Sequence, residues 1–349
     1  MQIEMRDSLA YAETEEEFEE APLMLAQAEK RNIVMSAPEY GTEDASDFTE
    51  ELKTVKFSFS GRLGVDEHIL SDASMRAADG KSYSFLKMYA GVWGDIKNAD
   101  FSTCFTDGDE NLPAEYYGAM GDLGMELVCT DSAENGALSD YGYESLGLGG
   151  EPVTEEIDGI TFASVLFGDK DSARPYDGES VSSDIEYADL ISDVVIAFVD
   201  WGSGVSESEM KSAAYKIAEA GADIIVGCGD TLSDVELLDT GDGSLTLAAY
   251  SLGSLLTTSE NTDDLIGGIL DFSITSYGEG SPISIEDITL IPTFTHYSGE
   301  YGGYQVFKVS EYSDALAEYH RIGSVSAAGL KAEVIKKVSA DFLPDDYKN

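Results

Sequence analysis

The stretch Val194-Val-Ile-Ala-Phe-Val-Asp-Trp-Gly202 joins a wholly apolar run to a polar turn and decides the fold. Gly221-Ala-Asp-Ile-Ile-Val-Gly227 repeats the pattern, and the segment Leu245 to Tyr250 runs into Ser-Leu-Gly253. A short apolar run bounded by turn residues is typical of a strand that is covered on both faces. Because helical spacing separates the first two runs, the sequence predicts an α/β domain with a covered sheet.

The segment between the first two runs is predicted to form an amphipathic helix. Ser206 begins it, and Glu209 stands three residues later, which is a capping-box pairing. Helical spacing then places five side chains on one apolar face: Met210, Ala213, Ala214, Ile217 and Ala218.

The same patterns divide the chain into three parts. Residues 1–51 form an acidic appendage with one possible helix, residues 52–312 an α/β domain, and residues 313–349 a helical C-terminal segment. The further strands expected are 55–59, 100–105, 125–129, 160–167, 269–275, 285–291 and 304–309. The further helices expected are 85–96, 114–123, 315–321 and 330–338.

The charge balance is extreme, with 68 acidic residues, 20 basic residues and a formal net charge of −48. It excludes nucleic acid as a partner, because binding phosphates needs clustered Lys and Arg. Two readings of the acidity stay open. It can be a solvated, self-repelling surface that salt stabilises, or it can collect calcium through carboxylates.

Compartment is not fixed by the cysteines or by a targeting segment. Cys104, Cys129 and Cys228 lie in or beside apolar runs, so we expect three buried free thiols. No apolar run approaches the ~20 residues of a membrane span, and the start has no apolar core of a secretory signal.

The order of the motifs resembles the CapA family of poly-gamma-glutamate capsule biosynthesis proteins. That family has His-Trp-Gly where this chain has Asp200-Trp-Gly202. It has Gly-His-His-Pro-His where this chain has Gly227-Cys-Gly-Asp-Thr231, and Ser-Leu-Gly-Asn-Phe where this chain has Ser251-Leu-Gly-Ser-Leu255. The glycines and apolar residues of the motifs are present, and their histidines are not.

Earlier motifs of the family fit in the same order. The family's Gly-Asp corresponds to Gly61-Arg62, and its Ala-Asp before Asn-Leu-Glu corresponds to Ala99-Asp100 before Asp107. Its Asn-Asn-His corresponds to a segment that places Asn135 and Gly136 at the last two positions. A later Ile-Pro-Thr strand corresponds to the chain around Pro292.

The resemblance implies a layered α/β fold of the calcineurin-like metallophosphatase type whose metal ligands have been replaced. The cleft positions that it assigns are Arg62, Asp107, Asn135, Gly136, Asp200, Gly229, Asp230, Thr231 and Ser254. A two-metal hydrolase activates water between two ions, and a cation at a ligand position repels them. Arg62 could pair with Asp107 or Asp200 and replace an ion, or it could point to solvent.

The remaining polar residues provide few further candidates for a metal site. Asp107, Asp200 and Asp230 could converge on calcium, which prefers oxygen ligands. His68 stands near the first loop and could reach the cleft, although a surface position is as compatible with its surroundings. His296 and His320 are predicted to be surface or strand-end residues.

Two hypotheses about function follow from the resemblance. The first is a non-catalytic, exported CapA-like protein, located outside the cytoplasm, that binds, scaffolds or self-associates at the cell surface without a cofactor. Apolar stripes at Leu23-Met-Leu25 and at Leu330, Val334, Ile335 and Val338 could mediate that assembly. The second is a capsule-type hydrolase, or a protein that handles an anionic polymer, with an altered metal set.

Overall fold

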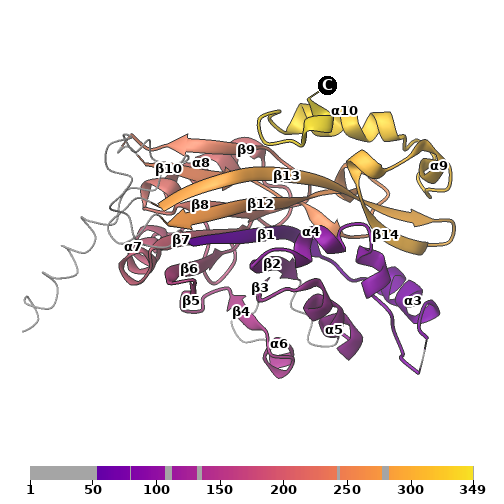
Figure 1. The fold of residues 1–349 in the computed structure, drawn as a ribbon, viewed down its shortest axis with the longest axis horizontal. Coiled ribbons are helices and arrows are strands. Elements are labelled where there is room, and N and C mark those ends of the chain that lie inside the picture. The colour runs from indigo at the N-terminus through magenta and orange to yellow at the C-terminus, as the bar shows by residue number, and fades with distance from the viewer. Residues whose placement is uncertain are drawn as a thin grey trace, which may run out of the picture.

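Two β-sheets lie face to face in the computed structural model, and helices flank them (Figure 1). The structure describes residues 53–78, 80–106, 112–131, 136–241, 244–276 and 283–348. The mixed α/β class expected from the sequence is therefore confirmed. The acidic appendage and its possible helix lie outside the described residues.

The first sheet is mixed and contains the strand that opens the domain. Its order is β14 (Gly302–Lys308), β13 (Ile283–Ser298), β12 (Ile266–Ser276), β1 (Lys53–Leu63), β2 (Phe101–Thr106), β3 (Leu127–Thr130) and β4 (Glu144–Gly147). β1 to β4 are parallel, whereas β12, β13 and β14 pair antiparallel. The short β11 (Ser254–Leu256) pairs with the end of β1.

The second sheet contains the three stretches with which the sequence argument began. Its order is β5 (Val153–Ile157), β6 (Ile160–Phe167), β7 (Val194–Asp200), β8 (Ile224–Cys228), β10 (Leu245–Ala249) and β9 (Val235–Asp239). β6, β7, β8 and β10 are parallel. The helices α7 (Val181–Ile191) and α8 (Glu207–Glu219) share a buried cluster with the outward face of this sheet.

The core between the sheets explains why β7 is apolar at every position. Phe198 of β7 meets Phe59 of β1, with ring centroids 5.4 Å apart, and so faces the first sheet. Val195, Ala197 and Val199 belong instead to the cluster under α7 and α8. Both faces of the strand are buried, so a continuous apolar run is required rather than an alternating one.

The remaining helices are short. They are α3 (Glu67–Met75), η1 (Leu86–Tyr89), α4 (Trp93–Lys97), α5 (Ala114–Leu123), α6 (Gly136–Asp140), η2 (Thr262–Leu265), η3 (Val309–Glu311), α9 (Asp314–Ala317), α10 (Ala327–Lys337) and η4 (Asp345–Tyr347). No helix among the described residues is long and apolar enough to cross a membrane.

Three local predictions were wrong in detail. The helix expected at 85–96 is divided into η1 and α4. Between the two, the backbone of β14 approaches Gly91, where a Cβ would lie 2.5 Å from the Val306 carbonyl oxygen. The helix expected at 315–321 is only the short α9. Ser206 is the N-cap of α8, but the capping box does not form: the Ser206 hydroxyl pairs with that of Ser208, and the Glu209 carboxylate pairs with Lys170.

The C-terminal segment packs on its own domain. Leu330, Val334 and Val338 of the proposed assembly stripe are buried in the core, whereas Ile335 is 47 % exposed. The backbone N–H of Leu290 in β13 donates to the Phe342 carbonyl, which ties this segment to the sheet. The stripe is therefore largely used within the chain. The other stripe, at residues 23–25, lies outside the described residues.

His296 and His320 were predicted as surface or strand-end residues; His296 does lie near the end of β13, but neither residue is at the surface. With Tyr312 they form what we call the buried histidine cluster, and the two histidines are 8 % and 4 % exposed. Nδ1 of His296 is 2.8 Å from the Tyr312 hydroxyl. Nδ1 of His320 accepts from the Ile322 backbone N–H. The sequence hides this arrangement, because it depends on residues 312–322 folding back onto β13.

Candidate functional site

A polar hollow, here called the main pocket, opens where the carboxyl ends of strands from both sheets meet. Its volume is about 810 Å³. It is lined by Arg62, Asp131, Leu148, Gly168, Asp169, Ser172, Ala173, Asp200, Gly202, Ser203, Gly229, Asp230, Ser254, Thr257, Thr258, Ser259 and Asp264. In open α/β sheets, ligands bind outside the carboxyl ends of the strands, so this is where a functional site is expected.

Close backbone contacts between glycines and neighbouring segments build the pocket floor. A Cβ on Gly61 would lie 2.1 Å from the Gly253 carbonyl oxygen, which no side chain tolerates. Gly253 itself has a φ of 58°, a left-handed conformation that favours glycine. The Arg62 N–H donates to the Gly253 carbonyl, and β11 then places Ser254 beside Arg62.

A second close contact lies beneath the loop after β7. A Cβ on Gly227 would lie 2.0 Å from the Tyr250 carbonyl oxygen and 2.3 Å from Nε1 of Trp201. The buried indole of Trp201 donates from Nε1 to the same carbonyl, at 2.6 Å. The Trp-Gly and Gly-rich motifs of the sequence therefore hold the strand ends together.

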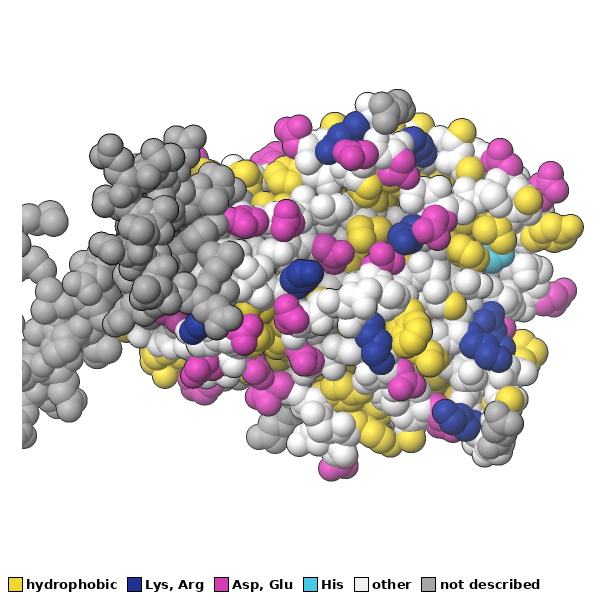
Figure 2. All heavy atoms as spheres, viewed as in Figure 1, with side chains coloured by type: hydrophobic (Ala, Val, Ile, Leu, Met, Phe, Trp, Pro, Cys, Tyr) yellow, Lys and Arg dark blue, Asp and Glu magenta, His cyan; other side chains and the backbone are white. Residues whose placement is uncertain are grey.

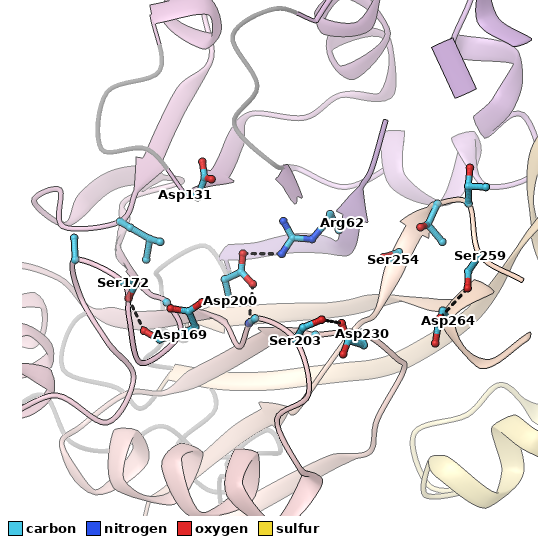
Figure 3. Close-up of a pocket in the computed structure, with 17 residues that line it drawn as sticks. Arg62, Asp131, Asp169, Ser172, Asp200, Ser203, Asp230, Ser254, Ser259 and Asp264 are labelled. Atoms are coloured by element: carbon cyan, nitrogen blue, oxygen red, sulfur yellow. Dashed lines mark hydrogen bonds and ion pairs between the residues drawn. The ribbon is translucent and has the colours of Figure 1, made fainter. Parts of the chain in front are cut away.

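An ion pair between Arg62 and Asp200 lies in the main pocket (Figure 3). The Arg62 Nη2 is 2.6 Å from the Asp200 Oδ2, and the two side chains are 21 % and 17 % exposed. The other oxygen of Asp200 accepts from the Gly202 backbone N–H. The pairing with Asp200, one of the alternatives left open for Arg62, is therefore present; Asp107, the other partner considered, lies outside the described residues.

The other carboxylates of the pocket are also engaged. Asp230 accepts from the Ser203 hydroxyl at 2.8 Å and from the Gly204 N–H at 2.9 Å. Asp264 accepts from the Ser259 hydroxyl at 2.8 Å (Figure 3). With Asp131 and Asp169, the lining contains five aspartates and one arginine. The pocket is therefore strongly negative.

The described residues do not fit the two-metal centre that the fold type implies. A permanently charged guanidinium stands where the resemblance expects a metal-binding Asp, and it is bonded to Asp200, where the resemblance expects a His. Among the described residues, no group of three or more His, Cys, Asp or Glu side chains is arranged to hold a metal ion.

Most of the predicted cleft positions that the structure describes lie together. Arg62, Asp200, Gly229, Asp230 and Ser254 all line the main pocket. Thr231 is half-buried beside the pocket and is not one of its lining residues.

The rest of the predicted set lies elsewhere. Gly136 is the first residue of α6, and Asp107 and Asn135 lie outside the described residues. His68 is not in the pocket lining, because its ring stacks on Tyr301 at 3.9 Å between centroids. The three cysteines are buried free thiols, as expected.

Sequence reasoning missed several pocket residues. Asp131 and Asp169 each follow closely on a predicted strand, so their place at the carboxyl ends could have been inferred. The segment Thr257–Ser259 and Asp264 could not, because β11 that precedes them is only three residues long. No sequence pattern predicts so short a strand.

Comparisons with known proteins describe the fold alone. No protein-family model matches this chain, and no curated protein matches it. The chain is similar to a crystal structure of a novel phosphatase from Mycoplasma pneumoniae, with a TM-score of 0.44 and 10 % identity over 69 % of this chain and 94 % of that one.

Two further solved structures are similar in the same way. One is a hypothetical protein from Thermus thermophilus, with a TM-score of 0.42 and 14 % identity over 68 % of this chain and 99 % of the other. The other is a putative 5'-nucleotidase from Staphylococcus aureus, with a TM-score of 0.38 and 11 % identity over 68 % of this chain and 54 % of the other. At these values the similarity concerns the course of the chain and not the chemistry of the pocket.

Proposed function

We propose that this chain is a non-catalytic, exported CapA-like protein with a metallophosphatase-like fold, which acts by binding, scaffolding or self-association at the cell surface. The observation that carries the proposal is the ion pair between Arg62 and Asp200 at the carboxyl ends of β1 and β7. Location and family rest on the resemblance of the motifs described above.

The ion pair supports the loss of hydrolysis on chemical grounds. A two-metal hydrolase needs two cations about 3.5–4 Å apart to activate water and to stabilise the leaving oxygen. The Arg62 guanidinium cannot be deprotonated at any ordinary pH, so it repels a dication placed near it. It also neutralises Asp200, the carboxylate that would otherwise attract an ion. In this proposal, the guanidinium of Arg62 takes the place of a metal ion beside Asp200.

The charge of the main pocket restricts what it can bind. Five aspartates and one arginine line it, on a chain whose formal net charge is −48. Phosphate esters and polyanions such as poly-gamma-glutamate are repelled by such a surface. Neutral polar or cationic ligands fit better. This counts against the second hypothesis, in which the pocket handles an anionic polymer.

A hydrolase assay separates the two hypotheses. The full chain is incubated with bis(p-nitrophenyl) phosphate and millimolar manganese, zinc or calcium, and nitrophenolate release is followed. We expect no release above the rate with metal alone. Release proportional to protein concentration, and lost in Asp200→Asn, would show an active centre with an altered metal set.

Self-association needs its own measurement. Light scattering on the full chain, across protein concentration and with and without calcium, is expected to show a mass above that of the 37.4 kDa monomer. A monomer under all conditions would contradict self-association and leave binding to a different surface component. Because α10 is part of the core, its removal is not a suitable test.

A further inference from the structure

A second hollow lies at the end of the molecule formed by the β13–β14 hairpin and α9, away from the ion pair. Its volume is about 840 Å³, and Glu260, Ser298, Glu318, Tyr319 and Arg321 are among its lining residues. We call it the Tyr319 hollow. Hydrophobic side chains gather on the surface at this end of the molecule (Figures 1 and 2). Tyr319 is 73 % exposed, so most of its ring is available for contact.

One wall of the hollow is held rigid by Arg321. Its Nε and Nη2 donate to the same Glu260 oxygen at 3.3 Å and 3.2 Å, and its Nη1 donates to the Gly299 carbonyl at 2.9 Å. The guanidinium lies 3.8 Å from the ring centroid of Tyr301. Tyr301 in turn donates its hydroxyl to Glu260.

Tyr301 is itself fixed by its neighbours. Its φ is 54°, which is uncommon for a non-glycine residue, its ring stacks on that of His68, and the ring of Tyr297 lies nearly parallel to it with centroids 5.9 Å apart. Tyr301 and Arg321 together keep the pKa of Glu260 below its usual range, so this carboxylate is ionised and ready to accept further hydrogen bonds. The wall therefore presents fixed acceptors and donors beside an exposed ring.

The charges in the Tyr319 hollow favour a neutral ligand. Arg321 is neutralised locally by Glu260, so the hollow offers no unbalanced cation to attract an anion. The net charge of −48 further repels anions. A cation attracted by Glu318 is the competing ligand, and the test below includes one. A neutral ligand for this hollow would stack an apolar face on Tyr319 and present hydroxyls to the carboxylates and the guanidinium.

We propose that the Tyr319 hollow binds a neutral saccharide ring. A pyranose has C–H groups on one face that pack on an aromatic ring, and adjacent hydroxyls that bridge a carboxylate and a guanidinium. The proposal does not depend on the loss of hydrolysis.

The test is calorimetric titration of the full chain with maltohexaose, cellohexaose and chitohexaose. We expect at least one of them to bind, with Tyr319→Ala weakening the affinity about tenfold and Tyr319→Phe keeping it, because stacking needs the ring and not the hydroxyl. Glu318→Gln is expected to weaken binding severalfold. The matched control is Tyr215→Ala, which removes another exposed tyrosine, on α8.

Four outcomes would overturn the proposal. They are no binding of any of the three oligosaccharides, equal affinity of the wild type and Tyr319→Ala, equal loss in Tyr215→Ala, and preferential binding of tetramethylammonium or of an acidic galacturonate oligomer. Circular dichroism of each variant confirms that the fold is kept, and Tyr319→Phe keeps the comparison usable should the alanine variant misfold.

Discussion

The main pocket and the buried histidine cluster each bring together polar side chains from separate segments of the chain. The two regions differ in the charge and the solvent exposure of those side chains. In the pocket, Arg62 and Asp200 stay charged and partly exposed, and they satisfy each other. In the cluster, His296 and His320 are buried as uncharged rings with hydrogen bonds to Tyr312 and to the backbone. Burial without an opposite charge favours the neutral form. The paired charges of the pocket remain in contact with solvent, whereas the cluster is packed in the interior.

The structure also changes the role assigned to the three histidines. The chain has three, of which the sequence suggests only His68 as a residue that could reach the cleft, whereas His296 and His320 are predicted at the surface or at a strand end. The structure places two of them in the core and the third on an aromatic stack. They are therefore packing residues.

The largest effect on stability is expected at Gly227, where two backbone segments beneath the main pocket approach each other most closely. Gly227→Ala places a Cβ 2.0 Å from the Tyr250 carbonyl oxygen, and no flexible side chain is there to move aside. We expect the free energy of unfolding to fall by about 4 kcal/mol or more, as for other severe core strain. Gly118→Ala, in α5, is the control: a Cβ there meets nothing within 4 Å, so a gain of up to about 1 kcal/mol is expected. Urea denaturation measures both, and equal effects would contradict the close-contact argument.

The second effect concerns pH and the buried histidine cluster. Burial, and then the neighbouring His320, lower the pKa of His296 to about 4. The folded state binds fewer protons than the unfolded state below about pH 6.5, so stability is complete above that pH and falls as the pH drops toward 4. The loss is about 3 kcal/mol at most.

Comparison of wild type with His296→Gln isolates this contribution. The variant is expected to lose less stability than the wild type between pH 6.5 and 4. Asp271 acts in the opposite sense, because burial raises the pKa of its carboxyl to about 6, and stability is then lost as the pH rises from 3.8 to 6. If the stability of wild type and of His296→Gln changed in parallel with pH, His296 would not contribute to the pH dependence.

How much of this could be read from the sequence depends on the range of the interactions. The parallel strands were predictable, because burial on both faces leaves a continuous apolar run such as β7. The pairing of Arg62 with Asp200 was one of two predicted options, since both follow strands whose ends meet. The histidine cluster was not predictable, because it depends on residues 312–322 returning to a strand that precedes them by about twenty positions.

The third effect is the coupling of the ion pair in the main pocket. A double-mutant cycle with Arg62→Met and Asp200→Asn is expected to give a coupling energy of about 1–2 kcal/mol, because the pair is mostly shielded from solvent. The surface pair of Lys336 and Glu333, with side chains 70 % and 30 % exposed, is the control and should give about 0–0.5 kcal/mol. Equal coupling in the two cycles would mean that the pocket pair does not organise the site.

The smallest effect separates general screening from a calcium site. Self-repulsion of a chain with a net charge of −48 is relieved by salt, so the melting temperature should rise by a few degrees between 0.05 M and 0.5 M sodium chloride. At matched ionic strength, calcium is expected to give no more than a small additional rise. A clear additional rise at millimolar calcium would place a specific calcium site among the carboxylates.

The most direct test of the central claim is the metal content of the full chain. The protein is dialysed against micromolar zinc and manganese, then against metal-free buffer, and its metal is measured by mass spectrometry. Because Arg62 stands where the resemblance expects a metal ligand and is paired with Asp200, we predict well under one ion per chain. One or two retained ions per chain, lost in Asp200→Asn, would contradict the claim that the ion pair has replaced the metal centre.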